Sequence, residues 1–119
     1  MPTVSGHTSA ISARRVLDKK IKDLTGNKIG VVEDLILDKL SNNIMFAVVS
    51  FGGLMGIGEK YFPLPWSLLT YDVSDDSYIV NVSREQLQTA PAYTVKELTE
   101  DDGERYRLQA FEFYNTARY

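Results

Sequence analysis

The sequence predicts a mainly β fold: a small barrel, or partly open barrel, of about six short strands, followed by a short helix and a C-terminal helix. Three observations carry this prediction. β-Prone runs alternate with short polar turns, a glycine-rich segment crosses between two of these runs, and an apolar stripe with helical spacing occurs only near the C-terminus. With 119 residues, the chain has room for a single domain.

Composition along the chain divides it into three parts. Residues 1–13 are rich in Pro, Ser, Thr and Gly and predict a flexible N-terminal segment. Residues 14–93 contain the strand signals and form the predicted barrel domain, and residues 94–119 form a C-terminal helical extension.

The first hairpin is marked by Gly26-Asn27, because both residues tolerate the positive φ of a tight turn. The run from Lys28 to Asp38 then alternates with period two. Its predicted apolar face comprises Ile29, Val31, Leu35 and Leu37. Glu33 also falls on this face, so we expect a β-bulge between Val32 and Asp34 that lets its side chain escape.

The strand Ile44–Phe51 is apolar on both faces. A strand of this kind is covered on both sides, and three covers are compatible with the sequence: a central position in the fold, the chain's own C-terminal segment, or another subunit.

The later elements follow from local signals. Lys60–Phe62 predicts a short strand ending at Pro63, and Pro65–Leu68 predicts one helical turn. A final hairpin joins Leu69–Val73 to Tyr78–Val82 through a polar turn. Ser83 is the expected N-cap of a short helix that Pro91 ends.

The C-terminal helix is expected to run from Asp101-Asp102 to about Tyr114, since acidic residues favour a helix N-terminus. Its apolar stripe consists of Tyr106, Ala110, Phe113 and Ala117, widened by Phe111 and Tyr114. We expect this stripe to pack on the chain's own barrel, and recruitment of a foreign partner is the alternative.

The composition argues against the common catalytic classes. The chain has no cysteine and a single histidine, His7, so it offers no thiolate nucleophile, Cys-based zinc site or histidine metal cluster. Acidic pairs at Glu33-Asp34, Asp75-Asp76 and Asp101-Asp102 are more typical of solvated carboxylates than of a catalytic pair. We therefore expect no enzyme activity, no catalytic residues, no cofactor and no metal.

The charge pattern makes nucleic acid an unexpected partner. Net charge is −3, and the basic run Lys19–Lys22 is better explained as a solvated strand edge than as a phosphate-binding patch. The sequence contains neither a secretory signal nor an apolar run long enough to cross a membrane. A cytoplasmic location is expected.

The segment Ser50–Trp66 is the most distinctive in the chain. Its glycines do not follow the Gly-x-Gly-x-x-Gly order of a dinucleotide loop, and a strand rather than a helix follows. We interpret them as a structural loop, formed by Gly52, Gly53, Gly56 and Gly58. Trp66 either plugs one end of the barrel or contributes to an interface.

The chain resembles the PRC-barrel family. The resemblance covers about residues 14–93 and rests on five segments in order: Lys28–Asp38, Phe46–Gly53, Gly56–Lys60, Pro65–Leu68 and Leu87–Tyr93. The family includes the cytoplasmic domain of the photosynthetic reaction centre H subunit and the C-terminal domain of the ribosome maturation factor RimM. This chain has neither the transmembrane helix of the former nor the N-terminal domain of the latter, so it looks like a stand-alone bacterial member.

The resemblance implies a six-stranded barrel that acts as a non-catalytic protein-binding and assembly module. We expect a protein partner and self-association, most simply as a homodimer, through strand Ile44–Phe51 or the glycine loop. The candidate interface residues are Phe51, Leu54, Met55, Ile57 and Trp66.

Two alternatives remain open. A small-ligand-binding protein or enzyme would use the barrel mouth beside Glu59 and Trp66, and would need a pocket of a few hundred Å³. An RNA- or ribosome-associated factor would use the Lys19–Lys22 region in a salt-dependent way.

Overall fold

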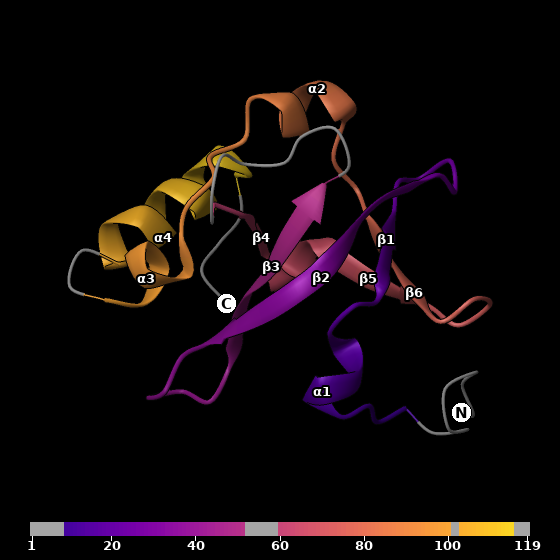
Figure 1. Ribbon diagram of the computed structural model, residues 1–119, viewed down its shortest axis with the longest axis horizontal. Coiled ribbons are helices and arrows are strands. Elements are labelled where there is room, and N and C mark those ends of the chain that lie inside the picture. The colour runs from indigo at the N-terminus through magenta and orange to yellow at the C-terminus, as the bar shows by residue number, and fades with distance from the viewer. Residues whose placement is uncertain (1–8, 52–59, 101–102, 116–119) are drawn as a thin grey trace.

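The computed structural model describes residues 9–51, 60–100 and 103–115. Six strands form one curled sheet with the order β4-β3-β2-β1-β6-β5 (Figure 1). The strands are β1 (Lys20–Lys22), β2 (Lys28–Leu37), β3 (Ile44–Phe51), β4 (Phe62–Pro65), β5 (Leu69–Asp72) and β6 (Ser77–Val80). Neighbours are antiparallel except β1 and β6, which are parallel. This mainly β architecture confirms the predicted fold class.

Short helices complete the fold. They are α1 (Ala13–Val16), the 3₁₀ turn η1 (Trp66–Leu68), α2 (Arg84–Gln88), α3 (Val95–Thr99) and α4 (Gly103–Phe113). The N-cap of α2 is Ser83, as predicted, and its side chain accepts a hydrogen bond from the Gln86 N–H. In Figure 1, α3 and α4 lie together on one side of the sheet.

The bulge predicted in β2 is present. Val32 pairs with Val49 and Asp34 pairs with Val48, so Glu33 has no partner in the ladder. The Glu33 carboxylate instead accepts a hydrogen bond of 2.6 Å from the Ser50 hydroxyl. The extra residue bends the strand, which helps the sheet to curl.

The predicted burial of β2 is only partly correct. Val32 and Ile36 are its deeply buried apolar side chains, whereas Leu37, placed on the apolar face by the alternation, is exposed. Two features explain the difference. The bulge shifts the alternation of buried and exposed residues by one position. The sheet is also covered by apolar side chains on both faces, so odd- and even-numbered residues of β2 both contact part of the core.

The boundary predicted for the fourth strand is wrong, because β4 contains Pro63 and Pro65 instead of ending at the first of them. β4 is an edge strand paired on one side with β3. Because the two prolines are two residues apart, their ring nitrogens point to the same edge of β4. This edge is the one that faces away from β3, so neither proline removes a hydrogen bond between β3 and β4.

Strand β3 is covered on both faces by its own chain. Ala47, Val49 and Phe51 belong to the core inside the curl of the sheet. Phe46 and Val48 belong to a second core, together with Leu98 of α3 and Phe111 of α4. This settles the choice left open by the sequence, because the C-terminal segment is the cover in the described structure, and the outer face of β3 is not free for another subunit.

The apolar stripe predicted for α4 is partly confirmed, and its last member, Ala117, lies outside the described residues. Ala110, Phe111 and the following Tyr114 are buried, whereas Tyr106 and Phe113 are only partly buried. Tyr114 enters the inner core, and its hydroxyl has no hydrogen-bond partner among the described residues.

Replacing Gly30 should be costly, because a Cβ there would lie 2.1 Å from the backbone oxygen of Ser50. We expect Gly30→Ala to lower the free energy of unfolding by about 2 kcal/mol or more, measured by urea denaturation. Gly26→Ala is the comparison: it has open space but a φ of 90°, and should cost about 1 kcal/mol. A Gly30 variant no less stable than the Gly26 variant would contradict the close approach of β2 and β3.

Removing the Tyr114 hydroxyl should stabilise the protein, since an unsatisfied buried polar group costs about 1–3 kcal/mol. Tyr114→Phe is therefore expected to raise the thermal midpoint. Tyr93→Phe is the matched control, because the Tyr93 hydroxyl donates to Gln109 Oε1 at 2.9 Å, and its loss should lower the midpoint. Equal effects of the two substitutions would show that the surroundings of Tyr114 are described wrongly.

Candidate functional site

Of the residues proposed from the sequence as an interface, Phe51 and Trp66 lie in the described part of the structure. Phe51 is 1% exposed and its ring packs on that of Phe62, with the centroids 5.2 Å apart, so it offers no surface to a partner in this structure. Trp66 is partly buried in η1, where its ring lies 5.6 Å from that of Tyr78. The remaining candidates fall outside the described residues: Gly52, Gly53, Leu54, Met55, Gly56, Ile57 and Gly58.

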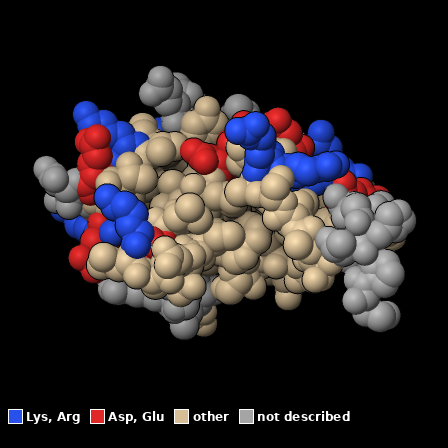
Figure 2. All heavy atoms as spheres, turned by 90° about the horizontal axis from the view of Figure 1, so that it is seen from below, with Lys and Arg blue, Asp and Glu red and all other residues tan. Residues whose placement is uncertain are grey.

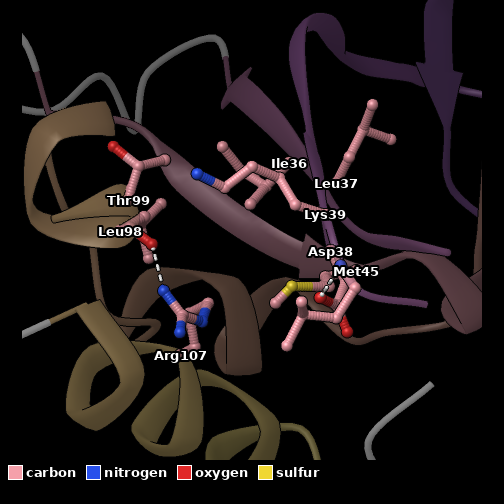
Figure 3. Close-up of a pocket in the computed structure, with 9 residues that line it drawn as sticks. Ile36, Leu37, Asp38, Lys39, Met45, Leu98, Thr99 and Arg107 are labelled. Carbon is pink, nitrogen blue, oxygen red and sulfur yellow. Dashed lines mark hydrogen bonds between the residues drawn. The ribbon is translucent and has the colours of Figure 1, made fainter. Parts of the chain in front are cut away.

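A different site is formed where the β2–β3 hairpin meets α3 and α4 (Figure 3). It is an open groove of about 550 Å³, which we call the hairpin groove. Nine residues line it: Ile36, Leu37, Asp38, Lys39, Leu40, Met45, Leu98, Thr99 and Arg107. Its volume is within the range of ligand and peptide sites.

One wall of the groove is the hairpin turn, whose conformation is fixed by Asp38. The Asp38 carboxylate accepts hydrogen bonds from the Leu40 N–H and the Ser41 hydroxyl, both at 2.9 Å. The left-handed backbone of Asn42, with a φ of 66°, closes the turn. This geometry leaves Leu40 96% exposed and Leu37 58% exposed.

The opposite wall is the corner between α3 and α4. Helix α3 begins with a capping box, in which Thr94 and Glu97 bond each other's backbone N–H groups. At the C-terminal end of α3, the Arg107 guanidinium donates a 2.6 Å hydrogen bond to the Leu98 carbonyl. A Cβ at Gly103 would lie 2.8 Å from the same carbonyl oxygen, so glycine permits the start of α4 to lie close to the end of α3.

The floor of the groove is apolar and its edges carry charge. Ile36, Met45 and Leu98 are buried and form the floor. Lys39 and Arg107 approach from opposite walls, and Figure 3 shows the Lys39 side chain extending across the groove toward α3. Within the described part of the chain, Lys39 makes no hydrogen bond or ion pair.

A smaller cavity lies beside Trp66. It measures about 130 Å³ and is lined mainly by apolar side chains, those of Ile44, Met45, Trp66, Ser67 and Phe111. This is less than the few hundred Å³ that the ligand-binding alternative requires at the barrel mouth. Glu59, the other residue of that alternative, is outside the described residues.

The basic run Lys19–Lys22 is neutralised within the fold. Lys22 is only 8% exposed and bonds Asp72 at 2.7 Å and Asp75 at 3.0 Å, while Lys19 pairs with Asp76. Strand β1 is an internal strand of the sheet, which corrects the expectation of a solvated edge. Lysines paired in this way are poor ligands for phosphate, so the structure adds no support to an RNA-binding surface here.

This ion network shifts the pKa values of its members. The hydrogen bond from Lys22 is the main cause that lowers the pKa of Asp72 to about 2, and the same bond raises the pKa of Lys22. The Ser77 hydroxyl, followed by Lys20 and Lys22, lowers the pKa of Asp75. The network fastens β1 to the β5–β6 hairpin and is structural in character.

Other kinds of site receive no support from the described residues. No group of three or more His, Asp or Glu side chains among them is arranged to hold a metal ion. In the same residues, no helix has the length and apolar character needed to cross a membrane.

Sequence reasoning missed the hairpin groove. The period-two alternation places Leu37 on a buried face, and Leu40 is not among the interface residues predicted from the sequence. The available signal was Leu40 itself, because a large apolar residue in a turn rich in Asp, Ser and Asn is exposed unless another element covers it.

Comparison with known families identifies one match. A model of the PRC-barrel domain matches residues 9–87, which is most of the chain. Comparison with curated proteins gives no match.

The ion network makes the stability of the protein depend on pH in the acidic range. Because the pKa of Asp72 is lowered on folding, the unfolded chain binds more protons than the folded protein between about pH 4 and pH 2. The contribution of Asp72 to stability is present above this window and is lost as the pH falls through it. Asp72→Asn should therefore weaken the loss of stability on acidification, measured by urea denaturation at a series of pH values.

The exposed Glu112 of α4 provides the control for this measurement. Glu112→Gln should retain the acid dependence of the parent protein. An unchanged acid dependence in Asp72→Asn would contradict the role of the Lys22–Asp72 pair.

Proposed function

Because the chain belongs to the PRC-barrel domain family, we propose that it is a non-catalytic protein-binding module and that the hairpin groove is a contact surface for its partner. The observation that carries the proposal is the pair of exposed leucines, Leu37 and Leu40, at the edge of an apolar groove. An apolar patch continuous with a groove is typical of interaction sites.

Energetics support a partner at this place. Full burial of a leucine side chain stabilises an assembly by about 1.5–3 kcal/mol. Leu37 and Leu40 keep much or all of their surface in water in the isolated chain, so covering them would contribute to association. The apolar floor formed by Ile36, Met45 and Leu98 provides a seat for a side chain of the partner.

Charged side chains surround the end of the molecule that carries the groove. In Figure 1 the β2–β3 hairpin, α3 and α4 lie toward the left of the molecule. Figure 2 shows the molecule from below; charged side chains of both signs gather at its left end, whereas a broad uncharged area occupies the middle of this face. The groove therefore combines an apolar floor with charge around it, and an apolar centre with a polar rim is common in protein interfaces.

The non-catalytic part of the proposal rests on composition. The chain has no cysteine and a single histidine, so the common nucleophiles and general bases are few. The hairpin groove adds Lys39, Arg107 and Asp38, of which Arg107 and Asp38 are engaged in holding the walls.

Any self-association would use a surface other than the outer face of β3, because α3 and α4 cover that face. A second copy and a different protein would both cover the leucines. The two partners give crosslinked products of different mass, so one experiment distinguishes them.

A photo-crosslinking amino acid at position 40 tests the proposed contact surface in cells that make the protein naturally. We expect a discrete crosslinked product that disappears when Met45 in the groove floor is replaced by Asp. The control position is Leu24, which is 69% exposed in the turn between β1 and β2.

The mass of the product identifies the partner type. Twice the 13.4 kDa of one chain indicates a homodimer, and any other discrete mass indicates a different protein. Products of equal yield at positions 40 and 24, or none at position 40, would contradict the proposed surface.

A further inference from the structure

The hairpin groove offers two kinds of contact at once. Its floor is formed by the apolar side chains of Ile36, Met45 and Leu98, which accept an apolar side chain. Leu37 and Leu40 extend this apolar surface outward along one wall. A segment that carries leucine-like side chains would therefore be complementary to the middle of the groove.

Positive charge faces the groove from both walls. Lys39 comes from the hairpin and Arg107 from α4, and their side chains approach the space between the walls (Figure 3). Arg107 is held in place by its hydrogen bond to the Leu98 carbonyl. Lys39 has no acidic partner among the described residues, so its charge is available to a ligand.

The lining of the groove contains two cationic side chains, Lys39 and Arg107, and one carboxylate, that of Asp38. The Asp38 carboxylate accepts hydrogen bonds from the Leu40 N–H and the Ser41 hydroxyl of its own turn. Its oxygens are thus directed into the turn. The groove is locally basic in a chain whose net charge is −3.

We propose that the hairpin groove binds an acidic, leucine-bearing peptide segment of a partner protein. An apolar side chain of the segment packs on Ile36, Met45 and Leu98, and flanking carboxylates pair with Lys39 and Arg107. This inference rests on the proposed function and adds the chemistry of the partner. Carboxylates on both sides of an apolar anchor match the two cations on opposite walls better than a neutral or basic segment does.

Binding of defined peptides to the full chain tests the proposal. The probe is a short fluorescein-labelled peptide of leucine and glutamate, and the comparison peptide has lysine in place of each glutamate. Fluorescence anisotropy should show at least about tenfold tighter binding of the glutamate peptide, weakening as salt is added. Equal binding of the two peptides, or no binding of the glutamate peptide at millimolar protein, would overturn the proposal.

Two matched pairs of variants locate the binding site. Lys39→Glu should weaken glutamate-peptide binding about fivefold or more and relax the preference over the lysine peptide, whereas Lys28→Glu, at an exposed position in the other hairpin, should not. Leu40→Ser should weaken binding, and Leu24→Ser should not. All four positions are exposed, so thermal unfolding confirms that each variant is folded. Equal losses within either pair would overturn the assignment to the groove.

The outcomes also separate this inference from the proposed function. A specific crosslink at position 40 together with equal binding of both peptides leaves the protein-binding function in place and refutes the acidic partner. A homodimer crosslink that the glutamate peptide does not displace assigns the groove to a second copy and likewise refutes it. Absence of any crosslink at position 40 refutes the proposed function itself.

Discussion

The structure depends on the contact between the outer face of β3 and the C-terminal helices. The Phe111 ring of α4 lies on the Phe46 ring of β3, with centroids 4.6 Å apart, and Leu98 of α3 is fully buried beside them. Without this cover, β3 would expose apolar side chains on one face of the sheet. The hydrophobic effect that buries this face also fixes where α3 and α4 lie.

The hairpin groove is a consequence of that docking. The start of α4 lies close to the end of α3, which explains the glycine at position 103 and the hydrogen bond from Arg107 to the Leu98 carbonyl. The corner then faces the β2–β3 hairpin, whose conformation is set by Asp38. The space between these two walls has an apolar floor and cations on both sides, and it is the surface that we propose for a partner.

Local signals predicted the local structure well. Glu33, a charged residue on the predicted apolar face of β2, indicated the bulge, and Ser83 indicated the start of α2. The capping box Thr94-x-x-Glu97 is an equally local signal, and it marks the start of α3, which is not among the helices predicted from the sequence. What could not be read were contacts between distant segments, such as the pairing of Lys22 with Asp72 fifty residues later, or the meeting of the hairpin with α3 and α4. A period-two pattern also does not show whether both faces of a strand are covered. For this reason the alternation alone places Leu37 in the core, although it is exposed.

Each chain covers its own β3 strand and thereby builds the groove. Isotope-filtered NMR on an equal mixture of labelled and unlabelled protein tests it directly through the ring protons of Phe46 and Phe111. We predict that nuclear Overhauser effects between these rings occur only within one chain. Effects between a labelled and an unlabelled chain would show that a neighbouring copy supplies the cover, and absence of any effect would show that α4 does not dock on β3. Either result would contradict this arrangement of β3 and α4.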